Sequence, residues 1–180
     1  MQPDNTNTLQ TNKFQLTFTR TPNVEYFCQT VALPGISIGE AIRSTPFIDL
    51  YHPGDKIIYD YLTVTFLLDE DFGAWDDIHT WIRGLGFPKD FEEYIKLARN
   101  NRAFKTPFDT VNRTQPPPQV SDAILTVLNS NQNPIRRFKF FDCFPTSLSP
   151  IILSATESPE NTPTADVTFR FSYFDVDKIS

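Results

Sequence analysis

The chain has 180 residues, a formal net charge of −6, 17 phenylalanines, 15 prolines and only six glycines. Its length fits one domain with a single core, and an aromatic content of 14% argues against a disordered chain. The negative charge argues against a protein that binds nucleic acid through clustered Lys and Arg side chains. The balance of aromatic, hydrophobic and charged residues favours a β-rich fold, and the many prolines indicate long, stiff connections.

The N-terminal residues 1–12 are polar and aperiodic, and we expect them to form a mobile tail ahead of a single domain, residues 13–180. They have neither a basic start nor an apolar core, so they do not resemble a signal peptide. No run elsewhere approaches the roughly 20 apolar residues of a membrane span. The sequence therefore predicts a protein without a membrane anchor that is made in the cytoplasm.

Alternation of apolar and polar residues predicts strands in the first third of the chain. The first strand covers residues 13–19, the second residues 24–31 (VEYFCQTV) and the third residues 36–42 (ISIGEAI). Residues 44–59 contain two prolines and a His-Pro-Gly-Asp turn, which predicts a long protruding loop or a loose hairpin. Residues 61–68 give the clearest central strand, because apolar side chains occupy every second position: Leu62, Val64, Phe66 and Leu68.

Between about residues 70 and 119 the pattern changes to a helical and loop insertion. Apolar residues recur there at steps of three and four and predict one helical stripe, which is made by Phe72, Trp75, Ile78, Ile82 and Leu85. We expect Gly84 and Gly86 to close this helix, and Pro88 prevents its continuation. A second helix is predicted over residues 90–101, before a long connection that carries several prolines.

The last third of the chain again predicts strands. Residues 123–128 and 136–141 flank a polar turn and form a predicted hairpin, which Pro145–Ser147 ends. One final strand is predicted, with Val167, Phe169, Phe171 and Tyr173 on one face. Together the elements predict a mainly β fold with one or two helices, a sandwich or barrel that a helix partly covers.

Three consecutive carboxylates, Asp69, Glu70 and Asp71, stand between the central strand and the first predicted helix. Carboxylates are favoured at a helix start, where backbone N–H groups lack partners and the helix dipole is positive. A general acid/base pair needs carboxylates that converge on a cleft, and a metal site needs further ligands; the neighbouring sequence supplies neither. We interpret the triplet as helix capping, in preference to a catalytic or metal-binding role.

Other reactive side chains lack the partners that catalysis needs. The two histidines, His52 and His79, lie outside any HExxH or cysteine-rich pattern, and the sequence has no nucleophile elbow or phosphate-binding glycine loop. The two cysteines, Cys28 and Cys143, lie in strand-like runs without metal-binding spacing, which favours buried thiols over a disulfide. We predict no catalytic, metal or cofactor site, and therefore no enzyme.

The segment 44–59 carries more apolar side chains than a free loop would expose, namely Phe47, Ile48, Leu50, Tyr51, Ile57 and Ile58. Prolines and a glycine interrupt the segment, so these side chains cannot all turn back into the subunit's own core. We expect them to be buried against another subunit.

Several runs stand in a distinctive order along the chain. YFCQTVALPG comes first, followed by the long loop with PGDK, then YDYLTVTFLLDEDF and the tryptophan-bearing WDDIHTWI. RRFKFFDCFPTSL and VTFRFSYFDV complete the series. In this order, over most of residues 13–176, the chain resembles the tail tube protein family of contractile-tailed bacteriophages.

The resemblance implies a structural virion protein whose subunits form hexameric rings that stack into the inner tail tube. Strands from six subunits would join into one ring-shaped β-barrel that lines the channel for DNA ejection, and DNA would pass without specific binding. The resemblance also implies assembly in the host cytoplasm, contacts with sheath and baseplate proteins, and a tape measure protein in the lumen. The ring-stacking interface expected in the 44–59 segment contains Phe47, Ile48, Leu50, Tyr51, His52 and Asp55.

The leading interpretation is therefore a subunit of the inner tail tube. Within the same family the alternatives are a baseplate tube-initiator ring, a tail-cap ring, and the tube of a bacterial injection or secretion system. Residues 87–119 exceed what the simplest tube subunits need, which indicates a sheath contact or a specialised ring. From other classes, a monomeric ligand-binding β-barrel would need a closed apolar cavity, and a hydrolase would need the acidic triplet as its catalytic group.

Overall fold

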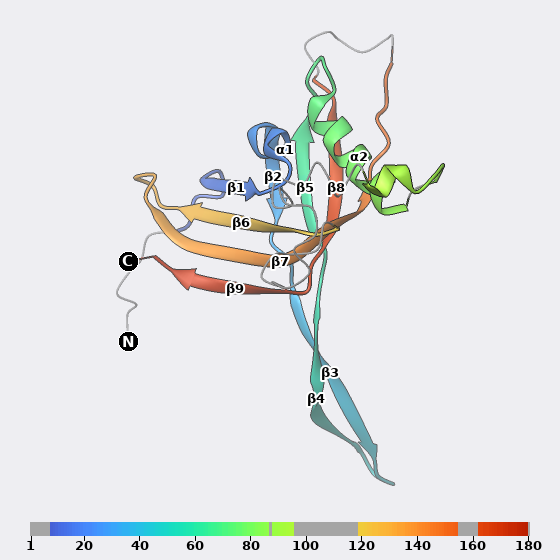
Figure 1. Ribbon diagram of the computed structural model, residues 1–180. Helices are drawn as coiled ribbons and strands as arrows, with labels where there is room; N and C mark the ends of the chain where they lie inside the picture. Colours follow the sequence, from blue (N-terminus) through green and yellow to red (C-terminus); the bar gives the residue numbers. More distant parts are fainter. Residues whose placement is uncertain (1–7, 87, 96–118, 155–161, 180) are drawn as a thin grey trace, which may run out of the picture.

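The structure, a computed structural model, describes residues 8–86, 88–95, 119–154 and 162–179. Within these ranges the chain is mainly β, as the sequence predicts, and its strands make one folded sheet and one protruding hairpin (Figure 1). The folded sheet has the order β1–β6–β7–β8–β5–β2, and β9 also pairs with β7. Its strands are β1 (Phe14–Phe18), β2 (Cys28–Ala32), β5 (Leu62–Leu67), β6 (Ser121–Leu128), β7 (Pro134–Leu148), β8 (Thr164–Arg170) and β9 (Tyr173–Lys178).

Strand β7 belongs to both halves of the folded sheet because it is long and bent. Its first half lies between β6 and β9 and completes sheet 1, in the order β1–β6–β7–β9. Its second half pairs with β8 and completes sheet 2, in the order β7–β8–β5–β2. At the bend, Asp142 has a φ of 57°, and its N–H donates to Asp122 Oδ1 at 3.3 Å. Aspartate adopts this left-handed conformation more readily than a bulky residue, so the bend lies where the sequence tolerates it.

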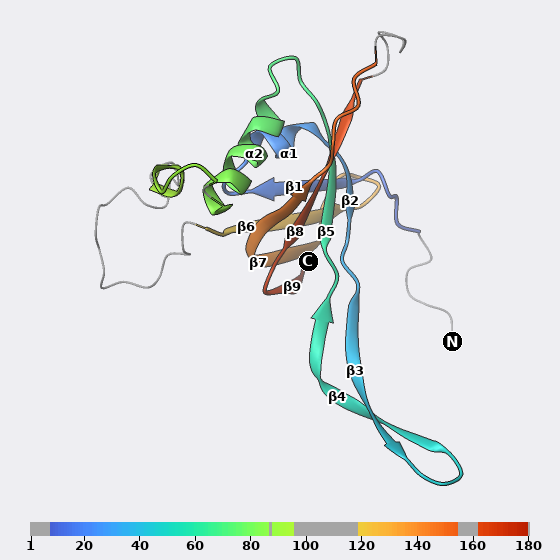
Figure 2. The same ribbon diagram turned by 90° about the vertical axis from the view of Figure 1, so that its right-hand side faces the viewer.

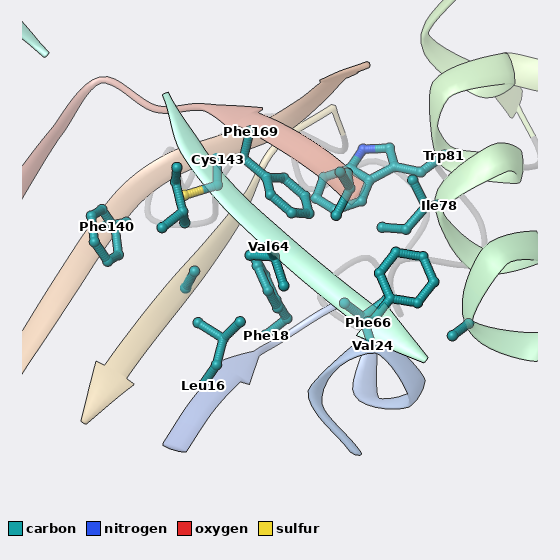
Figure 3. Close-up of a cluster of buried hydrophobic side chains, with 14 of the residues drawn as sticks. Leu16, Phe18, Val24, Val64, Phe66, Ile78, Trp81, Phe140, Cys143 and Phe169 are labelled. Carbon is teal, nitrogen blue, oxygen red and sulfur yellow. The ribbon is translucent and has the colours of Figure 1, made fainter. Parts of the chain in front are cut away.

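The two sheets enclose one apolar core, part of which is shown in Figure 3. Along β5 every second residue is buried and the intervening ones are half-buried, which confirms the predicted central strand. Phe18 of β1 contacts Phe169 of β8, with 4.8 Å between ring centroids, and so joins sheet 1 to sheet 2. Phe140 and Cys143 of β7 are fully buried in the same core.

Two helices cover the core, α1 (Pro22–Phe27) and α2 (Gly73–Gly86). Helix α2 buries Ile78 and Trp81, which point toward Phe169 (Figure 3). The indole Nε1–H of Trp81 donates to the Gln119 carbonyl at 3.0 Å, so the polar atom of this buried ring is satisfied.

The region around both helices differs from the predicted boundaries. Pro22 starts α1 inside the run that resembles a strand, because its fixed φ suits the first helical turn and the turn carries Val24 into the core. Phe72, the expected start of the helical stripe, precedes α2 and is 37% exposed. Gly84 does not close α2 but lies buried within it, and the helix continues to Gly86.

The last third of the chain differs from the prediction in its connections. Pro145–Ser147 does not end a strand. The pairing of β7 with β8 shifts in register between Pro145 and Ser147, and β7 continues to Leu148. The expected single final strand is two strands, β8 and β9, because the chain crosses from sheet 2 to sheet 1 after Arg170. The Ser172 N–H donates to the Phe141 carbonyl at 3.0 Å at this crossing. Tyr173 therefore begins a new strand and is 46% exposed.

Part of the predicted insertion lies outside the described residues. Of the second helix, expected over residues 90–101, the structure describes a helical turn at residues 92–95. Of the predicted tail, residues 8–12 are exposed, and residues 1–7 lie outside the description. The mobile tail and the single domain stay predictions.

The two tryptophans of α2 provide a test of the core. Replacing the fully buried Trp81 by Ala should lower the free energy of unfolding by about 3–5 kcal/mol, because it opens a cavity and leaves the Gln119 carbonyl without its donor. Trp75 is only partly buried and stacks on His79, so Trp75→Ala should cost clearly less. Urea unfolding of both variants measures the difference, and equal losses would contradict this assignment of the core.

Candidate assembly interface

The hairpin of β3 (Ile36–Ser44) and β4 (Asp49–Tyr59) is the part of the structure most separated from the core. It continues away from β2 and β5 and projects beyond the rest of the described chain in both views (Figures 1 and 2). Thr45 closes its tip, because its N–H and Oγ1–H donate to the Ile48 carbonyl at 3.1 and 2.6 Å. The turn predicted at His-Pro-Gly-Asp is therefore wrong, since these residues lie within β4.

One face of the hairpin, which we call the apolar face, carries three pairs of large apolar side chains. Directly opposite residues of an antiparallel pair point to the same side. On this side the register brings together three apolar pairs, Ile36 with Tyr59, Ile38 with Ile57, and Ile42 with Tyr51. Two pairs with polar members, Glu40 with Pro53 and Ser44 with Asp49, lie between and beyond them on the same side. The residues of the apolar pairs, except the half-buried Tyr59, are between 56% and 63% exposed, so the subunit does not cover this face itself.

The apolar face joins the core at the base of the hairpin. The Tyr59 ring lies 5.6 Å from the Phe171 ring and 5.4 Å from the Phe174 ring, measured between centroids. Tyr59 thus points to the core side of sheet 2, and the exposed isoleucines beyond it extend the same side. The apolar face therefore lies on the core side of sheet 2, but sheet 1 and the helices do not extend over it.

The opposite face of the hairpin is mixed in character. Its cross-strand pairs are Ser37 with Ile58, Ala41 with His52, and Arg43 with Leu50. Polar and charged groups stand here beside single apolar ones, which is normal for a surface that meets water. The hairpin is therefore two-sided.

A bulge in the middle of the hairpin separates its base from its tip. The register shifts between Ile38 and Glu40, so that β4 holds extra residues opposite Gly39. At this point Gly54 lies so close to Gly39 that a Cβ on Gly54 would stand 2.6 Å from the Gly39 carbonyl oxygen. Glycine is therefore required at position 54 by close backbone approach.

The six residues predicted as a stacking interface do not share one face. Tyr51 lies on the apolar face, whereas Leu50 and His52 lie on the opposite one. Phe47 and Ile48 are at the tip, where Phe47 is 93% exposed, and Asp55 lies in the bulge. Their stacking role stays a prediction.

Sequence reasoning missed half of the apolar face. Ile36, Ile38 and Ile42 were expected in a strand of the body, yet they form the exposed partner of β4. The alternating isoleucines were visible in the sequence. What was missing was the pairing of residues 36–44 with residues 49–59, which only the turn at Thr45–Ile48 reveals.

The acidic triplet lies at the start of α2. Asp69 Oδ2 accepts a hydrogen bond from the Gly73 N–H, the first of the helix, at 3.1 Å. Glu70 and Asp71 are exposed in the turn before it. Asp77, one turn into the helix, accepts from Asn23 Nδ2 of α1 at 2.8 Å, and burial raises the pKa of its carboxyl. The Asn23–Asp77 hydrogen bond joins α1 to α2, and these carboxylates do not form a converging pair.

Nothing else in the described part of the chain assembles a reactive centre. Cys28 and Cys143 are both free, and burial raises the pKa of these thiols to about 11 and about 12, which leaves them unreactive at neutral pH. His79 stacks on Trp75 with 4.6 Å between centroids. In the described ranges no group of three His, Cys, Asp or Glu residues is arranged to hold a metal ion, and no helix there is long and apolar enough to cross a membrane.

Comparison with known proteins identifies the family. Residues 2–177 match the family model described as phage tail tube protein. The chain belongs to this family. As a tail tube family protein it is a structural component of the virion tail, and the resemblance seen in the sequence is confirmed.

Among individual relatives, this tail tube family protein is 28% identical to the tail tube terminator protein of Enterobacteria phage T4 over 153 residues, or 83% of this chain and 76% of that protein. Two solved structures share its fold at low sequence identity. The tube-terminating cap of the anti-feeding prophage has a TM-score of 0.58, with 12% identity over 99% of this chain and 97% of that chain. A chain of the baseplate of the same prophage also has a TM-score of 0.58, with 10% identity over 97% of both chains.

The capping interpretation of the triplet predicts unequal effects of its members. Asp69→Ala should lower the free energy of unfolding by about 0.5–2 kcal/mol, because the Gly73 N–H loses its acceptor at the helix start. Asp71→Ala removes an exposed charge and should have a smaller effect. Chemical denaturation of both variants checks this, and a larger loss for Asp71→Ala would refute the assignment of the cap to Asp69.

Proposed function

We propose that this protein forms the ring that terminates the inner tail tube of a contractile phage tail. The observation that carries the proposal is the 28% identity to a tail tube terminator protein over 83% of the chain. The fold shared with a tube-terminating cap agrees with it. This supports the cap ring, an alternative in the sequence interpretation, better than its leading reading as a main tube subunit.

The open edges of the folded sheet support the proposed ring. Within the described residues, β1, β2 and β9 pair on one side only. Unpaired strand edges invite further pairing, and closure into a ring removes them. We therefore propose that copies of the chain join edge to edge in a homohexamer, as the family resemblance implies, around a channel through which DNA leaves the virion without specific binding.

The apolar face of the hairpin supplies the contact to the adjacent ring. Each large apolar side chain that becomes fully buried stabilises the contact by about 1.5–3 kcal/mol. The same contact recurs for every subunit of a ring, so a small loss per subunit is multiplied at the ring junction. The partner is the last ring of the tail tube, and sheath, baseplate and tape measure proteins complete the assembly as further proposed partners.

A terminating ring has a physical role that a tube subunit lacks. Head-to-tail contacts between identical subunits do not close and produce filaments of open length. A ring that offers the tube one matching surface, and no second copy of the tube's own surface, stops further addition. The second candidate function is a ring at the baseplate end of the tube, because a baseplate chain has the same TM-score as the cap.

The position along the tail tests the proposed function directly. Gold labelling of a peptide tag on this protein in purified tails should mark only the end of the tube opposite the baseplate, because the proposed ring ends the tube there. A tagged main tube subunit serves as the control and should be marked along the whole length. Label along the length would make the chain a main tube subunit, and label at the baseplate end would make it an initiator ring; either result contradicts the proposal.

Two neighbouring isoleucines of β4 test the docking face. Ile57 and Ile58 are 56% and 54% exposed but lie on opposite faces of the hairpin. Ile57→Ser should reduce the fraction of tails that carry the ring, because it removes apolar area from the face that docks. Ile58→Ser, a matched change on the other face, should leave that fraction unchanged.

The measurement is the amount of this protein that copurifies with tails, relative to the main tube subunit. Circular dichroism should show both variants folded, since neither side chain belongs to the subunit's own core. Equal losses for Ile57→Ser and Ile58→Ser would show that the apolar face is not the docking surface.

A further inference from the structure

An apolar groove of about 410 Å³ lies at one end of the sandwich, beside the start of β1. Both sheets line this groove, sheet 1 with Leu125, Val127 and Phe138, and sheet 2 with Val31 of β2 and with Leu33, which follows β2. Leu33 is 48% exposed, so the subunit does not close this end of its own sandwich. We call this surface the end groove.

Basic side chains border the end groove. Lys13 and Arg136 are among its lining residues, and Lys178 lies opposite Arg136 in the pairing of β7 with β9. Arg136 and Lys178 are both exposed, and neither forms an ion pair within the described residues. Like charges directly opposite each other in a sheet are destabilising, and a carboxylate from another molecule would relieve their repulsion. The end groove therefore fits a partner that is both apolar and acidic.

A surface of this kind lies in the helical turn that follows α2. We call residues 90–95 the outer turn. Phe91 and Ile95 are 61% and 36% exposed, and the Ile95 N–H donates to the Phe91 carbonyl at 3.2 Å. Residues four apart in a helical turn lie on the same side, so these two side chains form one apolar surface. Asp90 and Glu92 are exposed beside it, which makes the outer turn acidic as well as apolar.

The other side of the outer turn is fixed to the body of the subunit. Glu93 forms an ion pair with Arg83 of α2, and Tyr94 Oη accepts a hydrogen bond from Gln119 Nε2 at 3.1 Å. Gln119 also accepts from the buried Trp81 through its carbonyl. Glu93 and Tyr94 are half-buried, so these contacts hold the turn in one orientation. A surface held in its binding orientation loses less conformational entropy when it docks.

We propose that the outer turn of each subunit docks in the end groove of its neighbour in the ring. Phe91 and Ile95 contact the apolar lining, and Asp90 and Glu92 lie near the basic border. The inference rests on the proposed ring, and it names a second copy of this chain as the partner of both surfaces.

The positions of the two surfaces suit a cyclic arrangement. The starts of β1 and β7, which border the end groove, lie on one side of the subunit, and the outer turn lies on the other side in both views (Figures 1 and 2). One subunit therefore cannot fill its own groove. Contacts between two different surfaces are head-to-tail, and they generate rings when the rotation closes. The hairpin projects in another direction, which leaves it available for an adjacent ring.

Charge favours the outer turn over the other exposed apolar segment of the body. Ile152 and Leu153 are 85% and 74% exposed. Their described neighbours in the sequence, Pro150, Ile151 and Ser154, carry no charge. This segment therefore offers nothing to the basic border of the end groove.

Reciprocal charge reversal tests the contact in purified tails. Arg136→Glu and Glu92→Arg should each lower the amount of this protein that copurifies with tails by at least about tenfold, because each places like charges together at every junction between neighbours. The two changes combined restore opposite charges, so the amount should return to within about twofold of the unchanged protein. Arg136→Glu combined with Glu70→Arg, a matched reversal at an exposed position outside the outer turn, should not recover.

Circular dichroism should show all of these variants folded, because the changed side chains are exposed. Unchanged amounts for the single variants, or no recovery in the combination, would overturn the groove contact and leave the proposed function intact. Absence of the unchanged protein from tails would instead overturn the proposed function.

Cysteine cross-linking identifies the occupant of the groove independently. Glu92→Cys combined with Lys178→Cys, treated in tails with a short bismaleimide, should link this protein into a ladder of covalent oligomers. Glu92→Cys combined with Thr126→Cys, on the outer face of sheet 1, should give no ladder. Cys28→Ser in the background removes the partly exposed native thiol, while Cys143 is buried. No ladder from the first pair, or a link from Lys178→Cys to a different tail protein, would overturn the proposal.

Discussion

The structure depends on the alternation of side chains in β5 and in the hairpin of β3 and β4, two regular patterns whose phase changes by one residue at Asp60 and Tyr61. On one side lie the buried residues of the core and then the Ile36–Tyr59 and Ile38–Ile57 pairs; on the other lie threonines and then the mixed face of the hairpin. Since the period of a strand is two, alternation specifies both the interior of the subunit and the sides of the hairpin. In the proposed assembly the apolar area of the hairpin is buried as that of the core is.

This continuity explains why the isolated subunit is incomplete. The sandwich buries its own side chains around Phe169 and Trp81, and a subunit can fold with them alone. Beyond Tyr59, the hairpin has no buried apolar side chain, so its regular shape rests on backbone pairing and on the Thr45–Ile48 turn. Two-stranded hairpins are marginal in water, and docking to an adjacent ring, as proposed above, would give this one its second layer.

Local sequence patterns were sufficient to predict the elements with a clear hydrophobic period. Strict alternation identified β5, and spacing by three and four identified α2. Helix α1 was not recognised, because its six residues are rich in the aromatic and branched side chains that are typical of strands. The helix is favoured by the burial of Val24 in the core, which is a tertiary contact. The division of β8 from β9 was not predictable either, since the change of sheet after Arg170 is decided by tertiary contacts. For the candidate site, the sequence located the exposed apolar segment but not its faces, which require the register with β3.

The bulge at Gly39 and Gly54 has an evolutionary consequence. It fixes the register of the hairpin, and a slip by one residue would exchange the two faces. Insertions or deletions in β3 or β4 therefore preserve the arrangement only when they add or remove an even number of residues in a strand. The two extra residues of the β4 bulge obey this parity, because the apolar pairs on either side of it still point the same way. Related subunits can thus differ in the length of the hairpin by steps of two residues while each face keeps its orientation.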